Sequence, residues 1–131
     1  MIDFEDDGRY QPGVCNIGPA EIARRRQAGY AGLAATVALA VLFRLVHAPA
    51  WLRLSVALPA AVSISGFMQA RSRFCAGFGM AGLQNMGPLG QQARVEDAEA
   101  RAIDRRRAMR INAAAMGGGL AIGLAFALLP V

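Results

Sequence analysis

Apolar residues along this chain gather in three long blocks and do not alternate with polar residues at strand spacing. The first block covers 28–43 without a charged residue and continues to residue 46, and the others cover 51–70 and 111–131. A helix needs about twenty apolar residues to cross a hydrocarbon core of about 30 Å. The blocks therefore predict three transmembrane helices, of which the third has the most uniformly apolar and small side chains.

The first two blocks contain polar interruptions that a membrane helix tolerates. Arg44 is expected to extend its long side chain to the interface, and we expect Trp51 and Arg53 to lie there as well. Pro59 interrupts the second block, but Ser55 lies four residues earlier on the same face, where it can help to satisfy the freed carbonyl. Both blocks are therefore predicted to span.

The charge pattern predicts the orientation of the spans. The formal net charge is +5, and all fourteen basic residues are arginines. Apart from Arg9, they lie before the first block (Arg24, Arg25, Arg26), between the second and third (Arg71, Arg73, Arg94, Arg101, Arg105, Arg106, Arg107, Arg110), and beside the short connection between the first two (Arg44, Arg53). The positive-inside rule places the N-terminus and the middle segment in the cytoplasm and the C-terminus outside. Arginines at the edges of apolar blocks favour lipid head groups over nucleic acid as partners.

These observations predict an all-α integral membrane protein with three transmembrane helices, a helical hairpin followed by a third span, with interfacial and cytoplasmic helical segments. We expect an acidic flexible tail over 1–14 and a two-span hairpin with interfacial entry and exit segments over 15–86. A charged cytoplasmic helix should cover 87–110 and run into the third span, 111–131, where the two could form one unbroken helix. The acidic start is the reverse of a signal peptide, so no cleavage is expected.

Local signals predict how the middle and entry segments begin. Glycines and a proline at 87–90 should break the chain before a helix in which Asp97 lies within ion-pair reach of Arg101. Gly18 before Pro19 predicts a helix start, which we expect to be an amphipathic entry helix at the interface.

The exit segment over 71–87 is rich in glycines, which alternate with aromatic and methionine side chains. This pattern predicts a tight, non-helical or closely packed path along the interface, anchored by Phe74 and Phe78. A ligand-binding or catalytic loop is the alternative, and Cys75 is the residue that would serve it.

Both cysteines, Cys15 and Cys75, are predicted on the cytoplasmic side beside the end of a span, where a stable disulfide is not expected. The hairpin could still bring them together. Arg71 and Arg73 precede Cys75 and would favour a thiolate if it is partly exposed. Inert packing is the simplest interpretation; redox or sulfur chemistry, or a metal shared with another subunit, are the alternatives. No metal site is predicted within the chain, because two thiols are too few for a closed zinc site.

Small residues form two candidate helix-packing faces. Gly119 and Gly123 lie four residues apart in the third block, and Gly29 and Gly32 lie with Thr36 in the first. Such faces allow close approach of helices in a membrane. The sequence does not distinguish packing within the chain from self-association.

Two motifs resemble a known family. They consist of Asn16, Ile17, Gly18, Glu21, Arg25 and Gly29 before the first span, and of Cys75, Phe78 and Gly82 after the second. Their order and spacing are similar to those of the YgaP-like small inner-membrane transmembrane domain family, over residues 16 to about 85. The resemblance implies a bacterial inner-membrane protein. Ala76 replaces the family's proline after the cysteine, the third span has no counterpart in two-span members, and no rhodanese domain accompanies the chain.

No enzyme motif occurs in the sequence, and residues 22–95 contain no acidic residue, which disfavours a transporter acting alone. We also expect a three-span chain of this length to enclose no pocket of a few hundred Å³. Two function classes remain. One is a non-catalytic subunit or scaffold that packs with other membrane subunits or with itself, without a cofactor. The other is a membrane thiol protein that handles sulfur or redox equivalents through Cys75 and Cys15.

Overall fold

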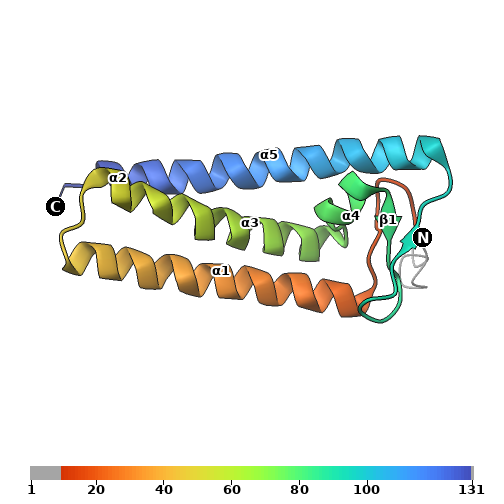
Figure 1. Ribbon diagram of the computed structural model, residues 1–131, viewed down its shortest axis with the longest axis horizontal. Helices are drawn as coiled ribbons and strands as arrows, with labels where there is room; N and C mark the ends of the chain where they lie inside the picture. Colours follow the sequence, from red (N-terminus) through yellow and green to blue (C-terminus); the bar gives the residue numbers. More distant parts are fainter. Residues whose placement is uncertain (1–9, 131) are drawn as a thin grey trace.

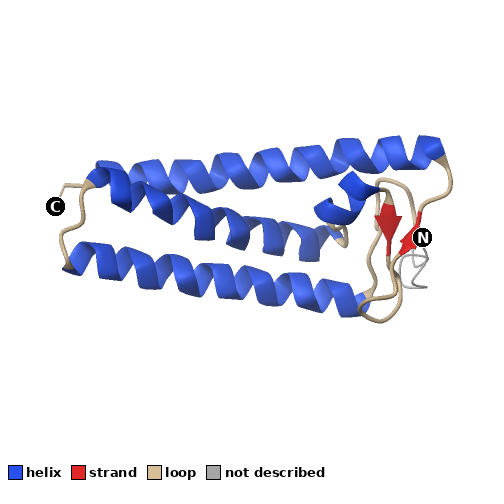
Figure 2. Ribbon diagram, in the orientation of Figure 1, coloured by secondary structure: helices blue, strands red, loops and turns tan. Residues whose placement is uncertain are grey.

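The computed structural model describes residues 10–130, and 72% of the chain is helical. The elements in chain order are α1 (Pro19–Leu45), α2 (Ala50–Arg53), the 3-10 helix η2 (Leu54–Val56), α3 (Ala57–Ser72), α4 (Ala76–Ala81), β1 (Leu83–Gln84), β2 (Ala93–Arg94) and α5 (Ala98–Leu128). The two short strands pair antiparallel, and the other elements of the described residues are helices (Figure 2).

The three long helical segments lie roughly along one axis, with α3 between α1 and α5 (Figure 1). At one end of the molecule, α4, the β1–β2 hairpin and residues 10–18 gather beside the start of α5; we call this the capped end. At the opposite end, α2 and the turn that precedes it lie beside the last described residues of α5 (Figure 1). The predicted hairpin and third helix are therefore confirmed as an arrangement of helices.

Three helical segments are long and apolar enough to cross a membrane, namely Pro19–Leu45, Ala50–Ser72 and Ala98–Leu128. Between 11% and 28% of the residues in their most apolar windows are buried within the molecule, and the others are partly or fully exposed. On α1 the exposed side chains include Leu33 and Val37. An apolar surface of this extent is suited to lipid or to another apolar surface.

Glycines bring α1 and α3 into close contact. A Cβ on Gly66 would lie 2.5 Å from the backbone nitrogen of Gly29, and a Cβ on Gly32 would lie 2.6 Å from that of Ser63. The Ser63 hydroxyl also donates to the backbone carbonyl of Gly29 at 2.9 Å. The first small-residue face is thus used inside the hairpin, although Thr36 bonds within its own helix to the Gly32 carbonyl.

The second small-residue face is also internal. A Cβ on Gly119 would lie 2.7 Å from the Ala57 carbonyl oxygen, and one on Gly123 would lie 2.7 Å from the Ala57 Cβ. These glycines therefore pack α5 against α3. In contrast, a Cβ on Gly117 would meet nothing within 4 Å.

The structure corrects the expected boundaries at the N-terminal side. α1 is one helix that begins at Pro19 with Gly18 as its N-cap, so there is no separate entry helix at the interface. The start signal was right, but the helix runs directly into the apolar block. Residues 10–14, expected in a flexible tail, are held against α5 by hydrogen bonds from Tyr10 and Gly13; residues 1–9 of that tail lie outside the described residues.

The later boundaries differ as well. The exit segment contains a helix, α4, which starts at the N-cap Cys75 and ends at Gly82, whose positive φ of 76° suits glycine. The charged helix runs into the apolar block as expected and forms one helix of 31 residues with it, but this helix begins at Ala98 and not near residue 87. Asp97 caps it by accepting from the Ala100 N–H at 3.3 Å, and so does not form the expected ion pair. Arg101 donates to backbone carbonyls instead.

The apolar core of the capped end lies between α4 and α5. Phe74, Ala76, Ala108 and Ile111 are buried there, with Met68 packed against them. Gly79 allows the two helices to approach, since a Cβ there would lie 2.9 Å from that of Ala108. This core fixes α4, and therefore Cys75, relative to the long helices.

Candidate functional site

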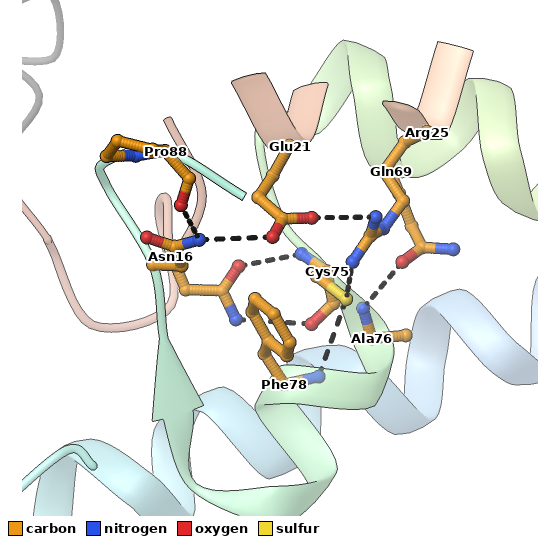
Figure 3. Close-up of polar contacts among 9 residues, drawn as sticks. Asn16, Glu21, Arg25, Gln69, Cys75, Ala76, Phe78 and Pro88 are labelled. Atoms are coloured by element: carbon orange, nitrogen blue, oxygen red, sulfur yellow. Dashed lines mark hydrogen bonds and ion pairs between the residues drawn. The ribbon is translucent and has the colours of Figure 1, made fainter. Parts of the chain in front are cut away.

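Cys75 lies at the centre of a polar network that joins the first turns of α1 to the start of α4 (Figure 3). Its Sγ accepts a hydrogen bond from Nη2 of Arg25 at 2.8 Å and one from the Phe78 N–H at 3.5 Å. Nη1 of Arg25 forms an ion pair with Glu21 Oε1 at 3.0 Å. The guanidinium also lies 5.6 Å from the centroid of the Phe78 ring. The sulfur therefore has a cation and a backbone donor as neighbours.

Two asparagines attach this centre to the segments on either side. The Asn16 side chain donates to the Cys75 carbonyl at 3.1 Å and accepts from the Cys75 N–H at 2.7 Å. The Asn85 amide donates to Glu21 Oε2 at 3.1 Å and to the Pro88 carbonyl at 2.8 Å. Residues 16–18 and 85 also bond through their backbones, because Asn85 N–H donates to the Asn16 carbonyl and Gly18 N–H to the Asn85 carbonyl, both at 2.9 Å. We call these residues, Asn16, Glu21, Arg25, Cys75, Phe78 and Asn85, the Cys75 network.

The Cys75 network is enclosed. Cys75 is 4% exposed, Glu21 1%, and Asn16 and Asn85 no more than 2%. In the described part of the chain, every buried side-chain nitrogen or oxygen has a hydrogen-bond partner. A Cβ at Gly18 would collide with the Met86 carbonyl oxygen, which shows how closely the entry segment is held.

The motif residues on both sides of the hairpin thus meet in space. Ile17 is 1% exposed and bridges to Asn85, while Gly29 packs on α3. The cation that contacts the sulfur is Arg25 of α1, which the sequence placed at the lipid interface; its side chain is only 15% exposed. That interfacial assignment was wrong because Glu21, one turn earlier, draws the guanidinium inward.

Cys15 belongs to a second cluster on α5. Tyr10 Oη donates to Asp104 Oδ2 at 2.6 Å, and Gly13 N–H donates to Oδ1 at 2.7 Å. Burial raises the pKa of the Tyr10 hydroxyl well above its usual range, and the bond to the Asp104 carboxylate raises it further. Arg107 donates to the carbonyls of Gly13 and Val14 and lies 5.2 Å from the centroid of the Phe74 ring. Both cysteines are buried, and neither forms a disulfide.

The other arginines expected at the interface divide into two groups. Arg24, Arg26, Arg44 and Arg71 are exposed, Arg73 is partly exposed, and Trp51 is 74% exposed. Arg53 is 5% exposed and does not face outward. It donates to the carbonyls of Ala127 at 2.6 Å, Leu129 at 3.1 Å and Phe126 at 3.3 Å, and so caps the end of α5. Its interfacial assignment is corrected accordingly.

Clefts of a few hundred Å³ lie on the surface of the described residues, but they are open, so they do not contradict the expectation that the chain encloses no pocket of that size. One of about 270 Å³ is lined by Arg25, Ser65, Gln69 and Asn112, among others. An apolar one of about 360 Å³ lies beside Gly117. A third, of about 450 Å³, lies beside Arg107 and Arg110. Within residues 10–130, no group of three or more His, Cys, Asp or Glu side chains is arranged to hold a metal ion.

Sequence reasoning missed several residues of these clusters. Asp104 looked like one charge among many on an exposed helix, yet it is fully buried. Gln69, whose Oε1 accepts from the Ala76 N–H at 2.8 Å, was read only as part of the second span. A polar residue inside an apolar block was the available signal for Gln69, since such residues rarely face lipid.

Fold and site together define a helical protein with three segments able to span a membrane and a closed polar network at one end. Comparison of the chain with protein-family models, with curated proteins and with solved structures found no match.

Proposed function

We propose that this chain is a non-catalytic integral membrane protein that acts as a subunit or scaffold in a larger membrane assembly or homo-oligomer. The observation that carries the proposal is the enclosure of the Cys75 network. Its thiol, guanidinium and carboxylate groups are of the types that catalysis uses, but here they bond to one another and to asparagine and backbone groups at the capped end. Every buried polar side-chain atom of the network has a partner within the described residues, so we assign these side chains the role of holding the cap rigidly on the helices.

We also propose that the protein is a multi-pass protein of the bacterial inner membrane with the capped end in the cytoplasm. The arginine-rich ends of all three helical segments lie at the capped end, whereas Arg44 and Arg53 lie at the other (Figure 1). The resemblance of the two motifs to the YgaP-like family is the basis for proposing a bacterial inner membrane, and Asn16, Arg25 and Cys75 of these motifs meet in one structural unit.

Topology is tested by fusing a reporter that is active only outside the cytoplasm. It should be active when fused after Val131 and inactive when inserted at Gln92, in the loop between β1 and β2. The opposite pattern would overturn the proposed orientation.

The scaffold proposal is tested by the mass of the purified assembly. Because both small-residue faces are used inside the molecule, a partner has to contact the outer apolar surfaces of the helices. Light scattering after mild-detergent extraction should give a protein mass well above the 13.8 kDa of one chain, and the co-purifying proteins should be identified. A lone monomer in several mild detergents and in bilayer discs would remove the basis for the proposal.

A thiol function is the second candidate, and the contact between Arg25 and Cys75 favours it. A guanidinium and a backbone N–H directed at sulfur are the kind of donors that stabilise a thiolate. In that case an uncharged thiol reagent should modify Cys75 in the folded protein faster than it modifies a model thiol at neutral pH, and Cys75→Ser should abolish function. The scaffold proposal expects slow labelling, because Cys75 is 4% exposed, and a nearly silent Cys75→Ser variant, because a hydroxyl can accept the same two hydrogen bonds.

A further inference from the structure

The cleft beside Arg107 and Arg110 lies where the charged part of α5 gives way to its apolar part. Its volume is about 450 Å³. Its lining includes Met68 and Ser72 of α3 and, from α5, the cationic side chains of Arg107 and Arg110 and the apolar ones of Ile103 and Ile111. The cleft therefore offers positive charge and apolar surface side by side.

The two cations are available to a ligand. Arg107 uses Nη1 to bond to the Gly13 and Val14 carbonyls, which holds its guanidinium at the cleft; within residues 10–130, its Nε and Nη2 have no acceptor. Arg110 is exposed, and no acceptor for it occurs in the same part of the chain. Asp104 is the nearest acid along this helix, but both its oxygens already accept from Tyr10 and Gly13, and it does not line the cleft.

Two helices independently indicate the level, relative to a membrane, at which the cleft would lie. Ser72 is the last residue of α3, and Ile111 begins the apolar stretch of α5. Both positions mark the border between apolar and polar segments, which is where phospholipid head groups lie beside a spanning helix. Basic pockets between helices at this level are suited to anionic head groups.

We propose that this cleft binds the phosphate group of an anionic phospholipid of the adjoining leaflet. Arg107 and Arg110 contact the phosphate oxygens, Ser72 lies beside them, and Met68, Ile103 and Ile111 contact the glycerol and the first acyl carbons. A phospholipid head group and inorganic phosphate both present a phosphate anion, but the apolar side chains of the lining favour the lipid.

The test uses the full chain in detergent micelles and native mass spectrometry to follow bound phosphatidylglycerol. Arg110→Gln should weaken binding about fivefold, since each arginine near an anionic lipid contributes about that factor. Ser72→Asp, which places a negative charge in the cleft and keeps both arginines, should weaken it at least as much. Arg105→Gln is the matched control, because Arg105 is exposed on the same helix, carries the same charge and lies outside the cleft.

The site is supported if Arg110→Gln and Ser72→Asp lose phosphatidylglycerol while Arg105→Gln retains it, and if phosphatidylcholine binds more weakly to the wild type. If Arg105→Gln and Arg110→Gln lost phosphatidylglycerol to the same extent, the loss would follow from net charge alone, and the proposed site would be overturned. Displacement of phosphatidylglycerol by millimolar inorganic phosphate would overturn the lipid assignment. Unchanged circular dichroism in each variant establishes that the comparison concerns binding and not folding.

Discussion

Arg25 donates a hydrogen bond to the sulfur of Cys75 at 2.8 Å, although the two residues lie 50 positions apart in the chain. The same guanidinium is paired with Glu21, which is 1% exposed. Arg25 therefore serves two purposes at once. It neutralises a buried carboxylate on α1, and it connects α1 to the N-cap of α4, so that the helical hairpin and its cap form one unit.

The first prediction follows from this double contact. Arg25→Gln removes the cation that pairs with Glu21 and should lower the free energy of unfolding by about 3 kcal/mol, since a buried carboxylate loses its partner. Arg24→Gln is the matched control, because Arg24 is exposed one position away, and it should change the stability by less than about 0.5 kcal/mol. Unfolding in a detergent titration measures both. Equal effects would mean that the ion pair contributes no stability.

The fold was partly predictable because a helix that crosses a membrane needs an apolar block long enough to cover the hydrocarbon core. Three blocks gave three long helices, and Gly18 with Pro19 correctly marked the start of α1. The β1–β2 hairpin was missed because its strands have two residues each and carry no periodic signal. Strand β1 is followed directly by Asn85, which hydrogen-bonds to Asn16, Gly18 and Glu21, residues far away in the chain.

The site was predictable only as a set of motif residues, not as a network. The sequence identified Cys75, Asn16 and Arg25 as motif residues, but it suggested the wrong cation for the thiol. Arg71 and Arg73 are close to Cys75 along the chain, whereas the cation that contacts the sulfur is Arg25, on the other helix of the hairpin. Asp104 and Tyr10, which bond across 94 positions, left no local signal at all. Polar pairs of this kind are fixed by tertiary packing.

Two glycines in α5 provide the second prediction. Gly119→Ala should destabilise the protein by about 2 kcal/mol, because the new Cβ would lie 2.7 Å from both the Ala57 oxygen and the Ala61 Cβ. Gly117→Ala should be neutral or stabilising by about 0.5 kcal/mol, because nothing lies within 4 Å of its Cβ and alanine favours helix. Thermal unfolding of the two variants tests the pair. Equal destabilisation by both would contradict the packing of α5 on α3.

The third prediction concerns the end of α5. Arg53→Gln should remove most of the hydrogen bonds to the Phe126, Ala127 and Leu129 carbonyls, and with them the cap of this helix. Hydrogen exchange should then accelerate over residues 124–130, while the capped end stays protected. Arg44→Gln, which alters an exposed arginine at the same end, is the control. Acceleration throughout the chain would show that Arg53 supports the whole fold instead of one terminus.

The fourth prediction concerns how residues 10–14 respond to pH. Because the pKa of Tyr10 is raised in the folded protein, the bond to Asp104 stabilises the attached segment fully below the ordinary tyrosine pKa of 10.0. As the pH rises above that value, the detached form loses its proton first, so attachment should weaken. Limited proteolysis between residues 10 and 15 should therefore increase in alkaline solution, while cleavage in the β1–β2 loop should not.

Tyr10→Phe separates this titration from general alkaline unfolding. The variant lacks the hydroxyl that donates to Asp104, whose carboxylate is fully buried, so its N-terminal segment should be cleaved faster at neutral pH. Its cleavage rate should then vary little with pH over the range in which the wild type changes, because no phenol at position 10 is left to ionise. A wild type and a Tyr10→Phe variant with the same alkaline increase would show that another group controls the attachment of residues 10–14 to α5.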